Sequence, residues 1–423
     1  MRQWLLSGCA RLAARMGLSA AGLCGILTCS ALSAAAQESG PLHVYLSADQ
    51  TGAHATGSSL HRGLEAGLRA GATRFDVPEI RILVRDHKNN LRRTGHTIDE
   101  ALSDPSTLAI MGGMHTPHYL RHGPRLNAEG LVLLLPWSSG AALTRLGLGA
   151  DNYIFRLSLD DRNTAPFLAR QSAGAGCARI AVLALSNGWG EQNAAAMVSE
   201  LDKHGVDTLP TIWVREEAEK ETLRFFVEDL RTAAPDCVIF VLSARVGALA
   251  ASVLATWDAP PKVFSHWGVL GGGFETTVSD AMWRHIDMSV LATCHFDALR
   301  APKDGASAPH AEARAILRSG SIEMPMAFVH AYDLSLVMLA AVEQARTDPR
   351  WSAGQQPRWA ALRDALEALE TPVDGLLKRY ETPFAPVTDA ASHSHEALHA
   401  GDLCLGEMRP DGRLVEAGGI ADP

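Results

Sequence analysis

The chain has 423 residues, of which 20% are charged, and its formal net charge is −9 with histidine neutral. An acidic chain without a cluster of basic residues is a poor candidate for binding nucleic acid or an anionic membrane surface, and we expect neither partner. The length exceeds what one ordinary hydrophobic core organises, so we expect two domains or lobes.

Residues 1–36 are predicted to be a secretory signal peptide. Three arginines precede an apolar stretch from Met16 to Leu32, and Ala34–Ala36 supplies small residues for cleavage. The stretch is short and rich in Gly, Ser and Ala, which disfavours a transmembrane anchor, and we identify no second apolar run of membrane length. Removing residues 1–36 would lower the net charge from −9 to −12. We therefore expect a protein exported to the periplasm.

Strand and helix patterns alternate along the rest of the chain. Strands are predicted at Leu42–Ser47, Ile80–Arg85, Leu108–Met111, Leu131–Leu135, Tyr153–Leu157, Ile180–Leu185, Thr211–Val214, Val238–Leu242, Lys262–Ser265 and Val290–Cys294. Helices are predicted at Gly57–Ala70, around Thr97–Ser103, from Thr116 onward, and at Gly190–Lys203, Leu223–Ala233, Gly247–Trp257, Ala308–Leu317, Met326–Glu343 and Trp359–Leu369, before short strands and loops over 375–415. Strands separated by single helices predict parallel βαβ units. The predicted fold class is therefore α/β, with two Rossmann-like lobes divided near Leu157.

Two neighbouring strands end in glycine and hydroxyl residues. Gly112–Gly113 leads to Thr116 at a helix start, and the next apolar run stops at Pro136, before Trp137–Gly140. At the carboxyl edge of a parallel sheet, free backbone N–H groups and short hydroxyls converge on a small ligand. Thr116, Ser138 and Ser139 are therefore candidate ligand contacts, although such hydroxyls can equally serve only as helix caps.

Four cysteines remain beyond the predicted signal peptide, namely Cys177, Cys237, Cys294 and Cys404. An even number in an oxidising compartment permits disulfides, but the spacing is not that of a disulfide framework. Cys177 and Cys237 begin strands that can be neighbours, so they could pair. The alternative is four small buried side chains, and the sequence leaves the pairing open.

Histidine clusters raise the question of a metal site. The candidates form two groups, His115, His118 and His122, and His393, His395 and His399. Zinc needs three or four converging ligands, and neither group has a convincing fourth member, so we predict no metal. The phosphate-loop, nucleophile-elbow and zinc-protease motifs are absent from the sequence, so we predict no catalytic residue, no cofactor and no enzyme.

The order of these features resembles the type I periplasmic binding proteins, in the Leu/Ile/Val-binding branch of transporter solute receptors. The matching features are Thr51–Gly52, Arg85–Asp86, Gly112–Thr116, Pro136–Thr144, Phe155–Arg156 with Asp160–Asp161, Asn187–Gly190, Ala234–Asp236 and His330–Asp333. The strings GGMHTP, PWSSG, GWG, SHWG and HAYD are similar to a subset without an assigned ligand, so we do not predict a leucine binder.

The resemblance implies a Venus flytrap whose two lobes are joined by three hinge crossings. Lobe 1 would comprise residues 41–156 and 296–378, and lobe 2 would comprise residues 157–295 with 379–423. In the amino-acid binders, residues at the positions of Thr116, Ser138 and Ser139 hold the ligand carboxylate.

The same resemblance implies contacts from lobe 2. An aromatic side chain at the position of Trp189 packs on the ligand, and a carboxylate in the loop after the Lys262–Ser265 strand neutralises its ammonium group. This chain places His266 and Trp267 in that loop instead, so a buried ammonium would lose most of its compensation. With Trp137, three tryptophans are expected at the cleft, which suits a planar, aromatic or largely apolar ligand, or a cation held by ring faces. Asp161 is expected to shape the cleft from near the hinge.

The predicted function is a periplasmic solute-binding protein, expected to be a monomer. It would close on a small organic ligand, not clearly an amino acid, and deliver it to an ABC permease of the branched-chain amino acid type in the inner membrane. The alternative is a periplasmic sensing subunit that docks on a histidine kinase or cyclase. A hydrolase-like role would require turnover, for which the sequence offers no motif.

Overall fold

The computed structural model describes residues 40–52, 54–147, 152–271, 274, 278–294, 308–388, 393–409 and 414–416. The predicted signal peptide lies outside the described residues. The residues from Leu42 onward form one unit with two main sheets.

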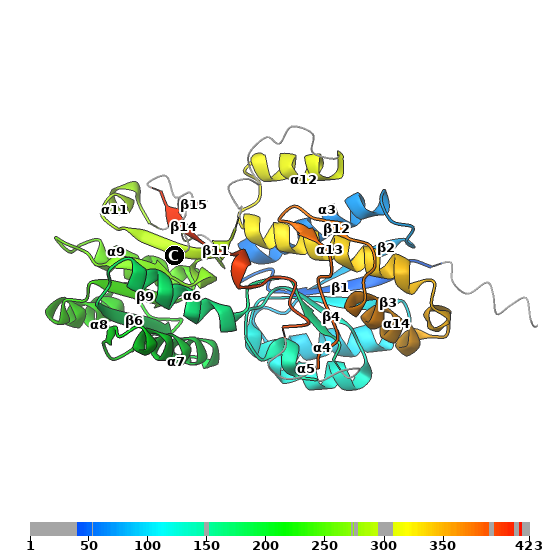
Figure 1. Cartoon of the computed structure of the whole chain (residues 1–423), viewed down its shortest axis with the longest axis horizontal. Helices are drawn as coiled ribbons and strands as arrows, with labels where there is room; N and C mark the ends of the chain where they lie inside the picture. The colour runs from blue at the N-terminus through cyan, green and yellow to red at the C-terminus, as the bar shows by residue number, and fades with distance from the viewer. Residues whose placement is uncertain are drawn as a thin grey trace, which may run out of the picture. The chain divides into compact units, whose positions relative to one another are not determined.

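The first sheet is built from the five strands β1 (Leu42–Ala48), β2 (Ile80–Asp86), β3 (Thr107–Gly113), β4 (Leu133–Trp137) and β5 (Ile154–Arg156). All its strands are parallel, in the order β2-β1-β3-β4-β5. Its helices are α3 (His54–Ala72), α4 (Leu91–Ser103), α5 (Thr116–Glu129), α12 (Ala308–Arg318), α13 (Pro325–Ala345) and α14 (Gln355–Glu367). Figure 1 shows α3 and α13 on one side of this sheet and α4 and α5 on the other.

The second sheet contains β6 (Arg179–Leu185), β7 (Asp207–Thr208), β8 (Ile212–Val214), β9 (Cys237–Val241), β10 (Lys262–Ser265), β11 (Met288–Thr293), β14 (Leu403–Met408) and β15 (Leu414–Glu416). Its order is β15-β14-β11-β10-β9-β6-β7, with β8 also paired to β6. The β11–β14 and β14–β15 pairings are antiparallel, so β14 runs opposite to the other strands. Its helices are α6 (Asp161–Gly174), α7 (Gly188–Lys203), α8 (Lys220–Ala233), α9 (Ala244–Leu254) and the short α11 (Asp280–Trp283). A third, two-stranded sheet pairs β12 (Val373–Asp374) with β13 (Arg379–Tyr380).

The predicted α/β class with two parallel sheets is confirmed. The apolar runs became strands because they are buried on both faces, as parallel strands under helices must be; β3, β4 and β9 are buried along their whole length. The chain passes between the sheets three times, after β5, after β11 and before β14, as expected for a three-crossing hinge.

Some predicted boundaries are wrong. Strands β3 and β4 do not stop at Met111 and Leu135, because their pairing continues to the Gly113–Trp137 partners. Helix α6 and strand β7 were not predicted at all. Helix α6 contains Pro166 and shows only weak amphipathic patterning, which hides it from a periodicity argument.

Helix α13 also contradicts the expectation that no second apolar run of the chain approaches membrane length. Its 21 residues are long and apolar enough to span a bilayer, but 94% of its most apolar window is buried inside the protein. It packs along α3, so it is the central core helix of the first lobe. The buried carboxylate of Asp333 in this helix accepts hydrogen bonds from the backbone N–H of Leu376 (2.6 Å) and Leu377 (2.9 Å).

Two disulfides cross-link strands of the second sheet. Cys177 pairs with Cys237 across the starts of β6 and β9, and Cys294 pairs with Cys404 where β11 ends beside β14. The second bridge therefore lies next to two of the three crossings between the sheets. Both pairings suit an oxidising compartment.

Candidate functional site

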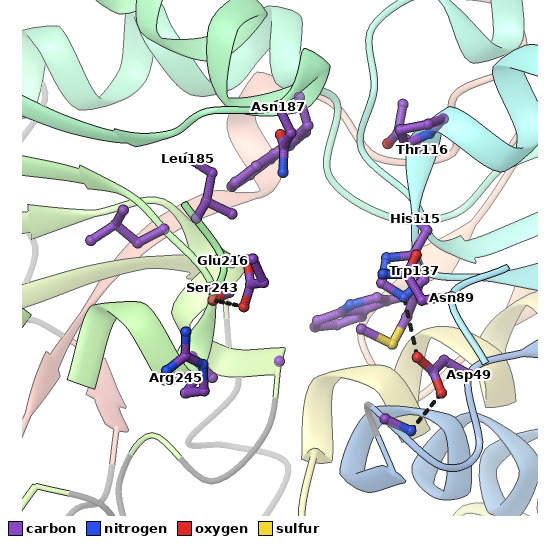
Figure 2. Close-up of a pocket in the computed structure, with 18 of the residues that line it drawn as sticks. Asp49, Asn89, His115, Thr116, Trp137, Leu185, Asn187, Glu216, Ser243 and Arg245 are labelled. Carbon is purple, nitrogen blue, oxygen red and sulfur yellow. Dashed lines mark hydrogen bonds and ion pairs between the residues drawn. The ribbon is translucent and has the colours of Figure 1, made fainter. Parts of the chain in front are cut away.

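A cleft of about 1190 Å³ opens where the carboxyl ends of strands from both sheets face each other. Figure 2 shows its two walls, with Thr116, His115, Trp137 and Asp49 on one side and Leu185, Asn187, Glu216, Ser243 and Arg245 on the other. Every labelled residue lies at the last position of a strand, in the turn after it or in the first turn of the next helix. The placement is the one expected for a ligand site of two parallel α/β sheets.

The loop between β3 and α5 is held in an uncommon backbone conformation. Met114 and His115 both have positive φ, at 64° and 59°, a region that costs free energy for residues with a side chain. The turn points the N-terminus of α5 at the cleft, and this helix has no acidic residue in its first turn. Because helix N-termini carry partial positive charge, this wall favours an anionic ligand group.

The next loop closes against the same helix start. The backbone N–H of Gly140 donates to the Thr116 hydroxyl at 3.2 Å, and a Cβ on Gly140 would lie 2.1 Å from the Thr116 methyl. A side chain at position 140 would therefore push Thr116 out of the cleft wall. The Thr116 hydroxyl accepts this bond and keeps its own proton for a ligand.

Ser138 and Ser139 differ in what their hydroxyls do. Both side chains line the cleft and both are buried. Within the described part of the chain, the Ser138 hydroxyl has no hydrogen-bond partner, whereas the Ser139 hydroxyl bonds the carboxylate of Asp161. A buried hydroxyl without a partner costs free energy unless a ligand supplies one. Ser138 is thus the better placed of the two for a ligand.

Two of the three predicted tryptophans meet across the cleft floor. Trp137 at the end of β4 and Trp267 after β10 stack with ring centroids 4.1 Å apart and planes 32° apart. Trp189, at the start of α7, lines the opposite wall and meets His266 edge-on at 4.9 Å. Gly268 lets Trp189 approach, since a Cβ there would lie 2.9 Å from the indole. All three indoles line the cleft.

His266 and Asp161 do not line the cleft. His266 is fully buried behind Trp189, and its Nε2 donates to Asp161 at 3.0 Å. Asn193 donates to the other Asp161 oxygen at 2.9 Å. Burial alone raises the pKa of Asp161, but the hydrogen bonds from His266, Asn193 and Ser139 outweigh it, so the pKa lies below its usual range. Asp161 is therefore a buried carboxylate that joins the two lobes.

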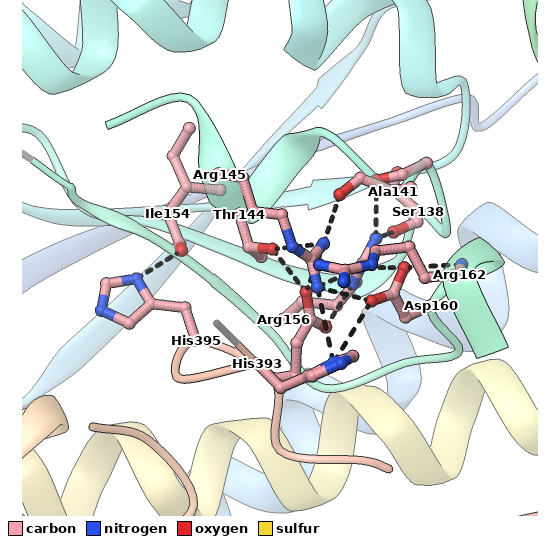
Figure 3. Close-up of polar contacts among 12 residues, drawn as sticks. Ser138, Ala141, Thr144, Arg145, Ile154, Arg156, Asp160, Arg162, His393 and His395 are labelled. Carbon is pink, nitrogen blue, oxygen red and sulfur yellow. Dashed lines mark hydrogen bonds and ion pairs between the residues drawn. The ribbon is translucent and has the colours of Figure 1, made fainter. Parts of the chain in front are cut away.

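A second buried ionic cluster supports the Ser138 loop from behind (Figure 3). Arg156 donates to the backbone carbonyls of Ser138 (3.2 Å) and Gly140 (2.9 Å). Its guanidinium also binds Glu396 through two contacts of 2.6 Å and Asp160 at 3.0 Å. Burial opposes the charge, but the carboxylates of Glu396 and Asp160 raise the pKa of Arg156.

The same cluster belongs to the hinge. Glu396 lies in the last crossing of the chain, which bridges to β5 at Arg156. Thr144 donates to Glu396, and Arg145 contacts Asp160 at 2.8 Å. The loop that carries Ser138 is thereby tied to the segment about which the lobes are joined.

The histidine groups are partly separated by the fold. His115 and His118 do lie together, but their third neighbour is His87 after β2, at ring distances of 5.6 and 4.8 Å. His122 instead bonds the carbonyl of Leu91. Burial lowers the pKa of His118 to about 3. Among the described residues, no group of three or more His, Cys, Asp or Glu side chains is arranged to hold a metal ion.

The C-terminal histidines do not converge either. His395 is buried between the Ile154 carbonyl (2.8 Å) and Glu367 (2.9 Å), while His393 lies 3.8 Å from Asp160. His399 caps the short 3-10 helix Ala400–Asp402.

Several cleft residues were not proposed from the sequence. They follow strands β1, β2, β8 and β9, and are Asp49, Thr51, Lys88, Asn89, Arg215, Glu216, Glu217, Ser243 and Arg245. The rule that ligands bind beyond the carboxyl ends of parallel strands applies to each of them, so the same signal could have found them.

Comparison with known proteins agrees with this architecture. A family model described as "Periplasmic binding protein" matches residues 43–403. No curated protein sequence matches the chain significantly. Among solved structures, a leucine-binding protein from Thermotoga maritima MSB8 has a TM-score of 0.68 at 13% identity, covering 89% of this chain and 98% of that one.

Two solute-binding proteins of ABC transporters from R. palustris are also similar. One, in complex with benzoate, has a TM-score of 0.70 at 14% identity and covers 90% of this chain and 96% of that one. The other, in complex with 4-hydroxybenzoate, has a TM-score of 0.69 at 14% identity and covers 89% of this chain and 96% of that one. At such identities the likeness concerns the fold. With two parallel sheets, three crossings and a family match over most of its length, this chain belongs to the periplasmic binding protein family and has the type I, Leu/Ile/Val-binding-like fold.

Proposed function

We propose that this protein is an exported solute-binding protein that captures a small organic ligand in the cleft and delivers it to an ABC permease in the inner membrane. The observation that carries the proposal is the cleft itself, which is lined by the strand ends of both sheets. It combines an unpartnered buried hydroxyl, a helix N-terminus and aromatic side chains. Sites of this kind orient a ligand with a few polar groups and bury its apolar body.

The proposed ligand contacts are Thr116, Ser138, Trp137, Trp189 and Trp267, each of which lines the cleft. Ser139, Asp161 and His266 act on the ligand through the buried hydrogen bonds that join them, and they set the positions of the loops around it. The lobes are proposed to be residues 41–156 with 296–378, and 157–295 with 379–423. The proposal also includes cleavage of residues 1–36, a periplasmic location and a monomeric state.

Several relatives support the transport role without fixing the ligand. The neighbouring structures include proteins in complex with leucine, benzoate and 4-hydroxybenzoate, all described as ABC transporter solute-binding proteins. A cleft of this family is thus compatible with a small carboxylate. The proposal for this chain is the broader one, a small organic molecule.

A thermal-shift screen tests the binding half of the proposal. The protein is unfolded, dialysed free of ligand, refolded with its disulfides intact and screened against amino acids, aromatic acids, amides, amines, alcohols and divalent metals. A ligand at about 100 times its Kd adds about 2.7 kcal/mol to the free energy of unfolding. A shift with one organic class supports the proposal, and a shift with metals alone contradicts it.

Capture of membrane proteins tests the delivery half. The ligand-loaded protein, cross-linked to membranes of its own cell, should retain a permease with its ATPase. Recovery of a histidine kinase or cyclase instead would contradict transport and favour the sensing role.

A further inference from the structure

Two buried carboxylates lie in or just behind the cleft wall, one from each lobe. Asp49 follows β1 and lines the cleft, and Asp161 opens α6 just behind the cleft wall. Their exposed fractions are 2% and 9%. Each carries the charge that would neutralise a bound ammonium.

Both carboxylates are already occupied by donors of the protein. One oxygen of Asp49 accepts from the backbone N–H of Thr51 (3.2 Å) and Gly52 (2.7 Å), and the other faces His115 Nε2 at 3.4 Å. Asp161 accepts from His266, Asn193 and Ser139 in the same manner. Each interior carboxylate is thus matched with a histidine and with further N–H or O–H donors.

An ammonium group buried beside these carboxylates would lose the water molecules that accept its hydrogen bonds and would gain few protein acceptors in their place. It carries three N–H donors and no acceptor, and its burial costs several kcal/mol unless acceptors receive those donors. The other carboxylates that line the described cleft, Glu216, Glu217 and Glu323, are exposed at its rim, where water screens an ion pair. Glu216 is in addition bonded to the Ser243 hydroxyl at 2.6 Å.

The Trp137–Trp267 pair does not compensate for this. A cation can be held by open ring faces. Trp137 and Trp267 instead stack on each other and are only 6% and 4% exposed, so their faces are largely covered. They offer an apolar floor and no cage for a cation.

A negatively charged ligand group, in contrast, would meet hydrogen-bond donors and a helix N-terminus. The Ser138 hydroxyl is free of a partner in the described structure, the Thr116 hydroxyl keeps its proton to donate, and the N-terminus of α5 faces the same wall. Hydrogen bonds to an ionised acceptor are the strong ones, so a carboxylate gains most at this wall.

We propose that the cleft selects small carboxylic acids with an apolar or aromatic body and no ammonium group, and rejects the α-amino acids of the same skeleton. This inference rests on the proposed function, because it names the ligand class of the same site. The discrimination arises because both interior carboxylates already accept from donors of the protein, so a buried ammonium gains no carboxylate of its own.

Matched pairs of ligands test the inference directly. 3-Phenylpropionate and L-phenylalanine share a skeleton and differ by the ammonium group, as do 4-methylpentanoate and L-leucine. Titration calorimetry of the refolded, ligand-free protein should show the deaminated acid of at least one pair binding about tenfold tighter or more than its amino acid. Equal or tighter binding of the amino acids overturns the inference.

A variant links the discrimination to the carboxylates. His115→Asn tolerates the left-handed backbone and shortens the side chain, which leaves one Asp49 oxygen without its histidine donor. We expect the preference for the deaminated acid to fall severalfold. The matched control is His61→Asn on α3, whose histidine faces Glu65 at 3.6 Å outside the cleft, and it should leave the preference unchanged. An unchanged preference in His115→Asn would overturn the role of Asp49.

Failure of this inference differs from failure of the proposed function. If neither member of any pair binds but another solute class raises the melting temperature, the ligand class is wrong and the solute-binding function stands. If no solute of any class binds, both are wrong.

Discussion

Trp137 and Trp267 come from different sheets and stack on each other at 4.1 Å, so the floor of the cleft is made by both lobes together. Movement of one lobe against the other must therefore slide or part these two rings. Aromatic pairs of this kind contribute about 0.5–1.5 kcal/mol beyond their buried area. The pair couples the contact between the lobes to the surface on which a ligand would rest.

Trp267→Ala should weaken ligand binding by about 1–2 kcal/mol, because it removes one half of the apolar floor. The measurement is titration calorimetry with 3-phenylpropionate, or with the ligand class found by thermal shift. Trp213→Ala is the control, since Trp213 lies on β8 outside the cleft and is 44% exposed. Equal affinity of Trp267→Ala and the wild type would remove Trp267 from the ligand surface.

Ser138→Ala and Ser139→Ala should separate binding from stability. Loss of the unpartnered Ser138 hydroxyl should lower affinity for a carboxylate about tenfold and change the free energy of unfolding by less than about 0.5 kcal/mol. Loss of the Ser139 hydroxyl takes a donor from buried Asp161 and should cost about 1–2 kcal/mol of stability. Calorimetry and urea unfolding check the two variants, and identical profiles would refute the distinction.

The buried histidine of α13 predicts a stability that falls in acid. Burial lowers the pKa of His330 to about 4, against about 6.5 for an exposed histidine. Between these values the unfolded chain binds a proton that the folded chain does not, so stability is lost as pH falls below about 6.5. The loss attributable to His330 is about 2 kcal/mol between pH 8 and pH 5.

His330→Gln isolates that contribution, because glutamine keeps an N–H to donate to the Pro136 carbonyl, which His330 contacts at 3.2 Å. Urea unfolding at pH 8 and pH 5 should show a smaller difference in the variant than in the wild type. The same difference in both proteins would place the acid sensitivity elsewhere.

Glu396→Gln should destabilise the protein by about 3–5 kcal/mol, because it leaves the fully buried Arg156 without its doubly bonded partner. Glu79→Gln at the exposed Arg81–Glu79 pair is the control, with an expected change below about 1 kcal/mol. Urea unfolding compares the two. Since Arg156 also holds the Ser138 loop, ligand affinity should fall in Glu396→Gln only.

Most strands, most helices and the loops that carry the site could be predicted from the sequence, because apolar runs and the residues that end them are local signals. Lys262–Ser265, for example, was predicted with the bounds of β10. The residues that those loops contact could not be predicted from the sequence. Glu396 meets Arg156 across 240 positions, and His87 meets His115 only because β2 and β3 flank β1.

The side-chain roles at the site were harder to predict than its location. The sequence placed His266 in a loop facing the cleft, yet the side chain turns inward to Asp161. A pattern of residue types does not say whether a hydroxyl or imidazole finds a partner within the protein. Whether it does depends on packing between segments far apart in the chain. The hydroxyl of Ser139 has such a partner in Asp161, and the hydroxyl of Ser138 has none among the described residues.

Helix α13 has a consequence for the export that we propose for this chain. A protein exported in the unfolded state threads through the inner membrane, and a 21-residue apolar segment is long enough to be retained there as a stop-transfer sequence. Asp333 lies near the middle of that segment, where an acidic residue costs about 2.5–3.5 kcal/mol for insertion into lipid. Asp333→Leu should accordingly leave more of the protein resistant to carbonate extraction from membranes, and an unchanged soluble yield would count against this role. The Asp333 carboxylate would therefore act twice. During export it would oppose insertion of this segment into the bilayer, and in the folded protein it binds the backbone N–H groups of Leu376 and Leu377.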